Sequence, residues 1–262
     1  MGSSRTFGRT KKGMMSQLHR YEYLLSVLPT LDPIGSIPPL GKSDLLNQVA
    51  NSKGPFQTVE MILLSDDLMQ YQALLAEEME RDRADLAILS LDKGEDETVL
   101  PAFLLPQETE EQAEAGKQNE RLSVDGIWAR YFHHAALVAK RSGSRFLRAW
   151  VGFEVGLRNA LVAARCRNLE LDPADYMVSP ELAEKDGDYS SVVSAWSSAA
   201  DPQAALEVLD RARWDWIEEH EGWYSFSACE IEAYAAKLVL LHRWRRILSE
   251  KRQGNKADSV SA

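Results

Sequence analysis

The longest regular pattern in the chain is an apolar stripe in residues 145–169. Its side chains recur at alternating steps of four and three residues: Phe146, Trp150, Phe153, Leu157, Ala160 and Ala164. Such steps keep side chains on one face of an α-helix, as in the seam between two packed helices. A second apolar face, in residues 127–141, is made of Trp128, Tyr131, Phe132, Ala135 and Val138. Because Ser142-Gly143-Ser144 separates the two faces, the pattern predicts an antiparallel helical hairpin.

Helix signals recur elsewhere, whereas strand signals are sparse. Asp201-Pro202 is typical of a helix start, and Ser227 with Glu230 forms a capping-box pattern that opens a final helix of about 22 residues. Arg81–Leu91 can continue a helix. We therefore predict a mainly α fold of helical hairpins or a bundle, with minor strand content near the N-terminus. Further helices are expected at 43–51, 55–76 and 202–220.

Composition suggests how the chain is organised along its length. Its basic start lacks large apolar residues, and a later stretch is rich in Glu and Gln, so neither is expected to pack. Translation can start at Met1 or at Met14/Met15. We predict a disordered basic extension (1–15), an N-terminal helical region (16–100), an acidic linker or loop (101–125), a C-terminal helical region (126–250) and a disordered tail (251–262).

The charge of the chain disfavours a general nucleic-acid binder. Its 262 residues carry a net charge of −10, and domains that bind nucleic acids are usually basic. The charges come in blocks, such as residues 130–169, where eight basic residues accompany only Glu154. These blocks can form patches that face partners, or simply solvated helix faces. No apolar run is long enough to span a membrane, and two cysteines fit a reduced, cytosolic setting.

No motif in the chain predicts catalysis. The GKS at 41–43 lacks the glycine spacing of a phosphate-binding loop, and Pro38 and Pro39 remove N–H donors that such a loop needs. His133 and His134 are adjacent, so on a helix they point about 100° apart and cannot chelate one metal as an i,i+4 pair would. We therefore expect no catalytic residue, no cofactor and no metal site.

Two groups of residues are candidates for contacts with a partner or for orienting helices. Glu154 and Arg158 are four residues apart on a helix, and Arg165 falls near the same face. The second group is Trp214, Trp216 and Trp223 around a helix end. Large aromatic rings often anchor interfaces. The alternatives are an ordinary ion pair for the first group and core packing for the second.

Several segments together resemble a bacterial family from V/A-type rotary ATPase gene clusters, the counterpart of the central-rotor component named C in V-type enzymes and d in eukaryotes. The Phe153-Glu154 and Leu157-Arg158-Asn159 spacing is the most specific part of the likeness. The matching segments are YEYLLSVLPTL (21–31) with the following Ile37-Pro38-Pro39, WARYFHHA (128–135), SGSRFLRAWVGFEVGLRNAL (142–161) and ARWDWIEEHEGWYSFSACEIEAYAAKLVLLHRW (212–244).

The resemblance implies a mostly helical, funnel-like protein that joins the central shaft to the membrane rotor ring without catalysing a reaction. Its partners would be the other V/A-type ATPase subunits, with no nucleic acid. The protein would be cytoplasmic and reach the inner membrane only through the complex. A helical adaptor or assembly factor of another cytoplasmic complex is the alternative, since charge blocks and tryptophans fit it equally well.

Overall fold

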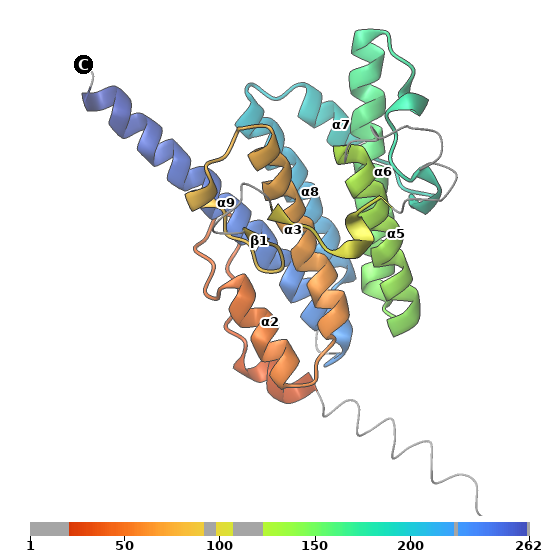
Figure 1. Cartoon of the computed structure of the whole chain (residues 1–262), viewed down its shortest axis with the longest axis vertical. Coiled ribbons are helices and arrows are strands. Elements are labelled where there is room, and N and C mark those ends of the chain that lie inside the picture. The colour runs from red at the N-terminus through yellow and green to blue at the C-terminus, as the bar shows by residue number, and fades with distance from the viewer. Residues whose placement is uncertain (1–20, 92–97, 107–122, 223–224, 261–262) are drawn as a thin grey trace, which may run out of the picture. The chain divides into compact units, whose positions relative to one another are not determined.

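The computed structural model describes residues 21–91, 98–106, 123–222 and 225–260, and it is mainly helical (Figure 1). The mainly α prediction is confirmed. Strand content within these ranges is limited to one antiparallel pair, β1 (Ser90–Leu91) and β2 (Thr98–Val99), with Ser90 opposite Val99. The labelled α-helices are α2 (Lys42–Asn51), α3 (Phe56–Leu75), α5 (Val124–Ser142), α6 (Arg145–Leu169), α7 (Ser190–Ser197), α8 (Pro202–His220) and α9 (Ala228–Val260).

The chain divides into two compact units. Unit 1 comprises residues 1–63 and 213–262, and unit 2 comprises residues 64–212. This division differs from the regions predicted along the sequence, because the C-terminal helix packs with N-terminal elements instead of with its neighbours in the chain. Residues 1–15 and most of the predicted acidic linker lie outside the described residues.

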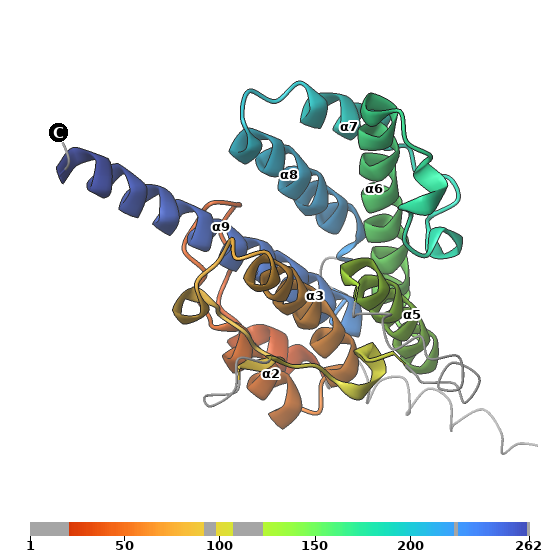
Figure 2. The same cartoon turned by 45° about the horizontal axis from the view of Figure 1, so that its top comes forward.

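In unit 1, α2 packs against α9, and Figures 1 and 2 both show these helices side by side. The proline-rich segment before α2 is held to α9 by two hydrogen bonds. The Tyr234 hydroxyl donates to the Pro29 carbonyl at 2.9 Å, and the His242 Nε2 lies 2.8 Å from the Leu40 carbonyl. The helix α9 runs to Val260 and has 33 residues, longer than expected and extending through most of the tail predicted to be disordered.

The predicted hairpin forms the main part of unit 2. The helices α5 and α6 pack together, and the break between them falls at the predicted Ser-Gly-Ser. Gly143 adopts a φ of +70°, which glycine tolerates well, and the Ser144 side chain accepts a hydrogen bond from the Leu147 amide as the N-cap of α6. The stripe residues Phe146, Trp150 and Phe153 are buried.

Two glycines on α6 bring other segments of unit 2 close to this helix. The Gly152 carbonyl accepts a hydrogen bond from the Glu184 amide at 3.1 Å. A side chain at Gly156 would overlap the ring of Tyr189, whose hydroxyl donates to the Phe153 carbonyl. The missing Cβ atoms thus make room for the segment that follows the hairpin.

The expected helix over Arg81–Leu91 is wrong. This segment contains only a short 3-10 helix, Arg81–Arg83, and then runs to β1. The fully buried Asp67 carboxylate of α3 accepts hydrogen bonds from the backbone amides of Ala87, Ile88 and Leu89. These amides therefore satisfy a buried charge, which a continued helix could not do because it would use them internally.

Candidate functional site

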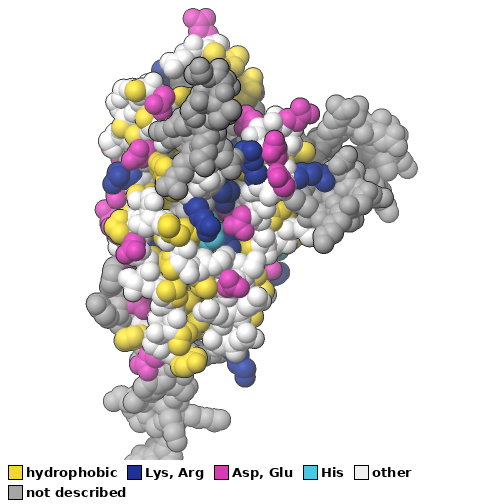
Figure 3. All heavy atoms as spheres, turned by 90° about the vertical axis from the view of Figure 1, so that its left-hand side faces the viewer, with side chains coloured by type: hydrophobic (Ala, Val, Ile, Leu, Met, Phe, Trp, Pro, Cys, Tyr) yellow, Lys and Arg dark blue, Asp and Glu magenta, His cyan; other side chains and the backbone are white. Residues whose placement is uncertain are grey.

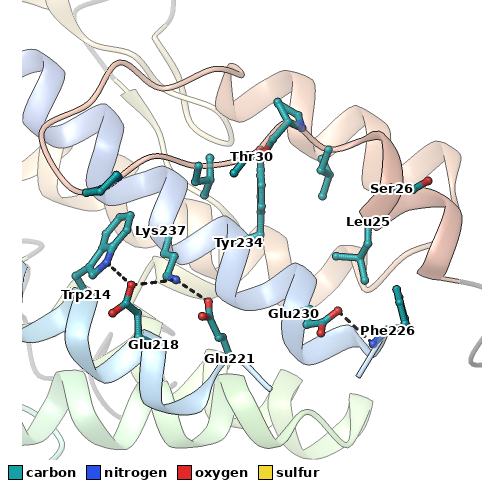
Figure 4. A pocket seen from close by; sticks show the side chains of 14 residues that line it. Leu25, Ser26, Thr30, Trp214, Glu218, Glu221, Phe226, Glu230, Tyr234 and Lys237 are labelled. Carbon is teal, nitrogen blue, oxygen red and sulfur yellow. Dashed lines mark hydrogen bonds and ion pairs between the residues drawn. The ribbon is translucent and has the colours of Figure 1, made fainter. Parts of the chain in front are cut away.

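Unit 1 contains a pocket of about 520 Å³, which we call the unit 1 pocket (Figure 4). One wall comes from the end of the helix at residues 21–27 and the loop that follows it, and the other from α8 and α9. Apolar side chains form most of the lining: Leu25, Leu28, Pro29, Leu31, Pro33, Trp214, Phe226 and Tyr234. Its volume is in the range of sites that bind small ligands or single side chains.

A chain of polar contacts runs along the α8–α9 side of this pocket. The Trp214 indole N–H donates to Glu218 Oε1 at 2.8 Å, and the Lys237 ammonium lies 3.6 Å from the same oxygen. Lys237 also pairs with Glu221 Oε2 at 2.6 Å and lies 5.1 Å from the centroid of the Trp214 ring. Figure 4 shows these four side chains joined in sequence.

Burial differs sharply along this polar chain. The Lys237 side chain is 9% exposed and Glu221 is 11% exposed, whereas Glu218 is 52% exposed. Lys237 and Glu221 therefore form a buried, mutually neutralising pair, while Glu218 presents its charge to solvent. A buried pair of this kind costs desolvation free energy that only good geometry and further hydrogen bonds recover.

The start of α9 fixes the end of the pocket that lies beside Phe226. Glu230 Oε1 accepts a hydrogen bond from the Ser225 amide at 2.6 Å, and Oε2 accepts one from the Phe226 amide at 3.1 Å. The capping-box glutamate thus acts as predicted in kind, but it satisfies amides one and two residues before the Ser227 cap. Phe226 has a φ of +49°, and these hydrogen bonds help to hold that backbone conformation.

The pocket is suited to binding rather than to acid–base chemistry. Its charged groups are three carboxylates and one ammonium, so its ionised lining is net negative. Burial raises the pKa of the Tyr234 hydroxyl to about 12, which keeps it protonated as a hydrogen-bond donor to Pro29. An apolar wall beside an exposed carboxylate fits a ligand that combines an apolar body with a cationic group.

Of the predicted tryptophans, only Trp214 lines this pocket. Trp216 is buried and stacks on His220, with ring centroids 3.9 Å apart, and the His220 Nδ1 lies 2.7 Å from the Trp216 carbonyl. Trp223 lies outside the described residues. The structure thus places Trp216 in core packing, the alternative to an interface anchor.

The predicted charged residues lie in unit 2. Arg158 reaches across the hairpin to Asp125 of α5, with Nη2 and Oδ1 2.9 Å apart, and lies 5.2 Å from the centroid of the Trp128 ring. Arg165 lies 5.2 Å from the centroid of the Trp196 ring on α7. Arg158 therefore ties the two hairpin helices together, which favours the helix-orienting interpretation for this residue.

Glu154 is half-buried on α6 and acts on two tyrosines. Burial, with the charge of Glu154 as a smaller cause, raises the pKa of Tyr131 above its usual range. Burial also raises the pKa of Tyr189 to about 12, with smaller contributions from the charges of Glu184 and Glu154. Both hydroxyls thus stay protonated over the usual pH range.

Sequence reasoning missed most of the pocket. Glu218, Glu221, Tyr234 and Lys237 belong to segments predicted as helices or their ends, but their spacing does not reveal that they meet residues 25–33. One local signal exists, because Trp214 and Glu218 are four residues apart and so lie on one helix face.

Neither a metal-binding cluster nor a membrane span is found among the residues that the structure describes. Within residues 21–91, 98–106, 123–222 and 225–260, no group of three or more His, Cys, Asp or Glu side chains is placed to hold a metal ion. No helix in the same ranges is both long and apolar enough to cross a bilayer.

Comparison with protein families matches residues 73–257 to the family described as "Protein of unknown function (DUF2764)". The matched range contains α5–α9 and every pocket residue contributed by α8 and α9, but not the pocket wall at residues 25–33. No curated protein and no solved structure matches the chain.

Proposed function

The chain belongs to the DUF2764 family, and for this member of it we propose the role of a non-catalytic component of a V/A-type rotary ATPase. In that role it couples the central shaft to the membrane rotor ring during ion-translocating ATP synthesis or hydrolysis. It would be cytoplasmic and would reach the inner membrane through its partner subunits.

The observation that carries this proposal is where the resembling segments fall in the fold. Residues 128–135 and 142–161 belong to the α5–α6 hairpin, and residues 212–244 end α8 and make the first half of α9. Residues 21–31 form the opposite wall of the unit 1 pocket. The likeness thus covers the long helices and the pocket, which are the parts that a coupling protein would use.

Long helices suit a part that transmits force. At 1.5 Å per residue, the 33 residues of α9 span about 50 Å. Within unit 2, Arg158 and the tight contact at Gly156 fix neighbouring elements to α6. Elements fixed in this way deform little under load, because packed interiors have low compressibility.

Purification from the native host tests the proposal. The chain is tagged at its C-terminus in the chromosome, and membranes are solubilised in a mild detergent. We expect the shaft and ring subunits of the V/A-type ATPase to co-purify in constant ratio, together with ATP hydrolysis that the isolated chain lacks. An unrelated tagged protein of the same host serves as the control.

Recovery of the chain without any shaft or ring subunit would contradict the proposal. The alternative, a helical adaptor or assembly factor of another cytoplasmic complex, draws support from the unit 1 pocket, since such a pocket would serve any partner of suitable chemistry. Co-purification of a different, stoichiometric set of proteins would identify that role.

A further inference from the structure

The unit 1 pocket combines two features that together define a ligand class. Its walls include the flat rings of Trp214, Phe226 and Tyr234, along which an extended side chain can lie. At one side Glu218 presents a carboxylate that is 52% exposed. The other nearby charges already oppose each other, because Lys237 pairs with Glu221 at 2.6 Å.

The carboxylate of Glu218 is also oriented. The Trp214 indole N–H donates to its Oε1 at 2.8 Å, and this contact holds the side chain beside the apolar wall. A cation that enters the pocket can therefore pair with a placed charge and rest its stem on aromatic surface. A guanidinium group fits this better than an ammonium, because it is planar, stacks on aromatic rings and is less strongly hydrated.

Exposed apolar side chains beside the pocket point to a polypeptide as the source of the cation. Tyr23 and Val27, on the helix that precedes the pocket wall, are 71% and 48% exposed, and Ile37 in the following loop is 78% exposed. Figure 3 shows hydrophobic side chains of this kind at the surface among charged ones. A small free cation would leave them in water, whereas a polypeptide can cover them.

We propose that the unit 1 pocket binds an arginine side chain of a partner polypeptide, with apolar residues next to that arginine covering Tyr23 and Val27. Charge complementarity supports this occupant, since the lining carries three carboxylates against one ammonium. The inference goes beyond the proposed rotor role and does not depend on it, because it specifies the chemistry of the partner and not its identity.

The test uses the full chain and the peptide acetyl-Leu-Leu-Arg-Leu-Leu-amide, with binding measured by calorimetry. The matched peptide has citrulline, a neutral isostere, in place of arginine. We expect the arginine peptide to bind about tenfold more tightly, as one charge-assisted hydrogen bond is worth roughly 1.5–3 kcal/mol. Glu218→Gln should abolish this difference while keeping an acceptor for Trp214, and Glu219→Gln, on the exposed neighbouring residue, should leave it unchanged.

A second pair of variants tests the location. Thr30 is exposed and lines the pocket, so Thr30→Trp should fill it and remove peptide binding, whereas Thr30→Val should retain it. Thermal unfolding of each variant verifies that the fold is intact. The proposal fails if both peptides bind equally, or if folded Glu218→Gln or Thr30→Trp binds like the wild-type chain. Benzylguanidine binding as tightly as the arginine peptide would overturn the assignment to a polypeptide.

Discussion

Each compact unit contains a tryptophan ring with a cation about 5 Å from its centroid, but the two sites differ in how much water reaches them. In unit 1, Lys237 beside Trp214 is 9% exposed and its partner Glu221 is 11% exposed. In unit 2, Arg158 beside Trp128 is 28% exposed and its partner Asp125 is 59% exposed. The same pairing of residue types thus forms a buried site in one unit and a surface tie in the other.

This difference determines what each pair contributes. A charge pair in water is screened and gains little, whereas removing one member of a buried pair leaves an uncompensated charge in a medium that solvates it poorly. We therefore expect the pair of unit 1 to matter greatly for stability when broken, and the pair of unit 2 to matter mainly for orienting α5 against α6.

The largest effect is expected for Lys237→Met, which leaves the Glu221 carboxylate buried without its partner. By analogy with other broken buried pairs, the free energy of unfolding should fall by roughly 3–5 kcal/mol. Urea unfolding followed by tryptophan fluorescence measures this change. The double variant Lys237→Met with Glu221→Leu should recover most of the loss. Equal stability of the single and double variants would contradict the uncompensated-charge explanation.

The next largest effect is expected at a site in unit 2 that involves no charge pair. Gly156→Ala places a methyl group where the Tyr189 ring lies, and overpacking of this kind costs roughly 1–3 kcal/mol. Tyr189→Leu in the same chain should relieve the overlap and reduce the additional cost of the alanine. If Gly156→Ala alone is as stable as the wild-type chain, the packing described between α6 and Tyr189 is incorrect.

A smaller effect is expected for Arg158→Met, which removes the partly exposed pair with Asp125 but keeps an apolar stem against Trp128. The free energy of unfolding should fall by about 1 kcal/mol or less. The change should shrink further in 1 M salt, because the Debye length falls to about 3 Å. A loss as large as that of Lys237→Met would remove the distinction between the two sites.

The smallest effect is confined to alkaline pH and compares one tyrosine from each unit. Burial raises the pKa of both Tyr234 and Tyr189 to about 12, above the usual value of 10. Between these values the unfolded chain loses the phenolic proton while the folded chain keeps it, so stability declines as pH rises from 10 toward 12. Tyr234→Phe and Tyr189→Phe should each flatten this decline in urea unfolding between about pH 9 and about pH 11.5. Unchanged slopes would contradict the raised pKa values.

The sequence predicts local features well. The α5–α6 hairpin, its Ser-Gly-Ser break and the start of α9 near Ser227 all follow from periodicity and capping, which depend on residues within a few turns of each other. The expected helix over Arg81–Leu91 fails for the opposite reason. Its amides bind the Asp67 carboxylate, and this contact joins residues about twenty positions apart.

The candidate site shows the same limit more clearly. Residue type and clustering single out Trp214, but nothing local indicates that Glu221 and Lys237 pair, or that residues 25–33 close the other wall. These segments are about two hundred residues apart in the chain. The exposure that separates Glu218 from Glu221 likewise depends on that closure and not on their helix.

Taken alone, the sequence determined that this protein is helical, where its hairpin turns and which capping residues start its helices, because these properties depend on interactions between near neighbours. Only the tertiary structure decided that α9 returns to the N-terminal segment, that a pocket forms between them, and that one tryptophan–cation pair is buried while the other is exposed. Burial and charge pairing arise from contacts between segments distant in the chain, which a pattern along the sequence does not specify.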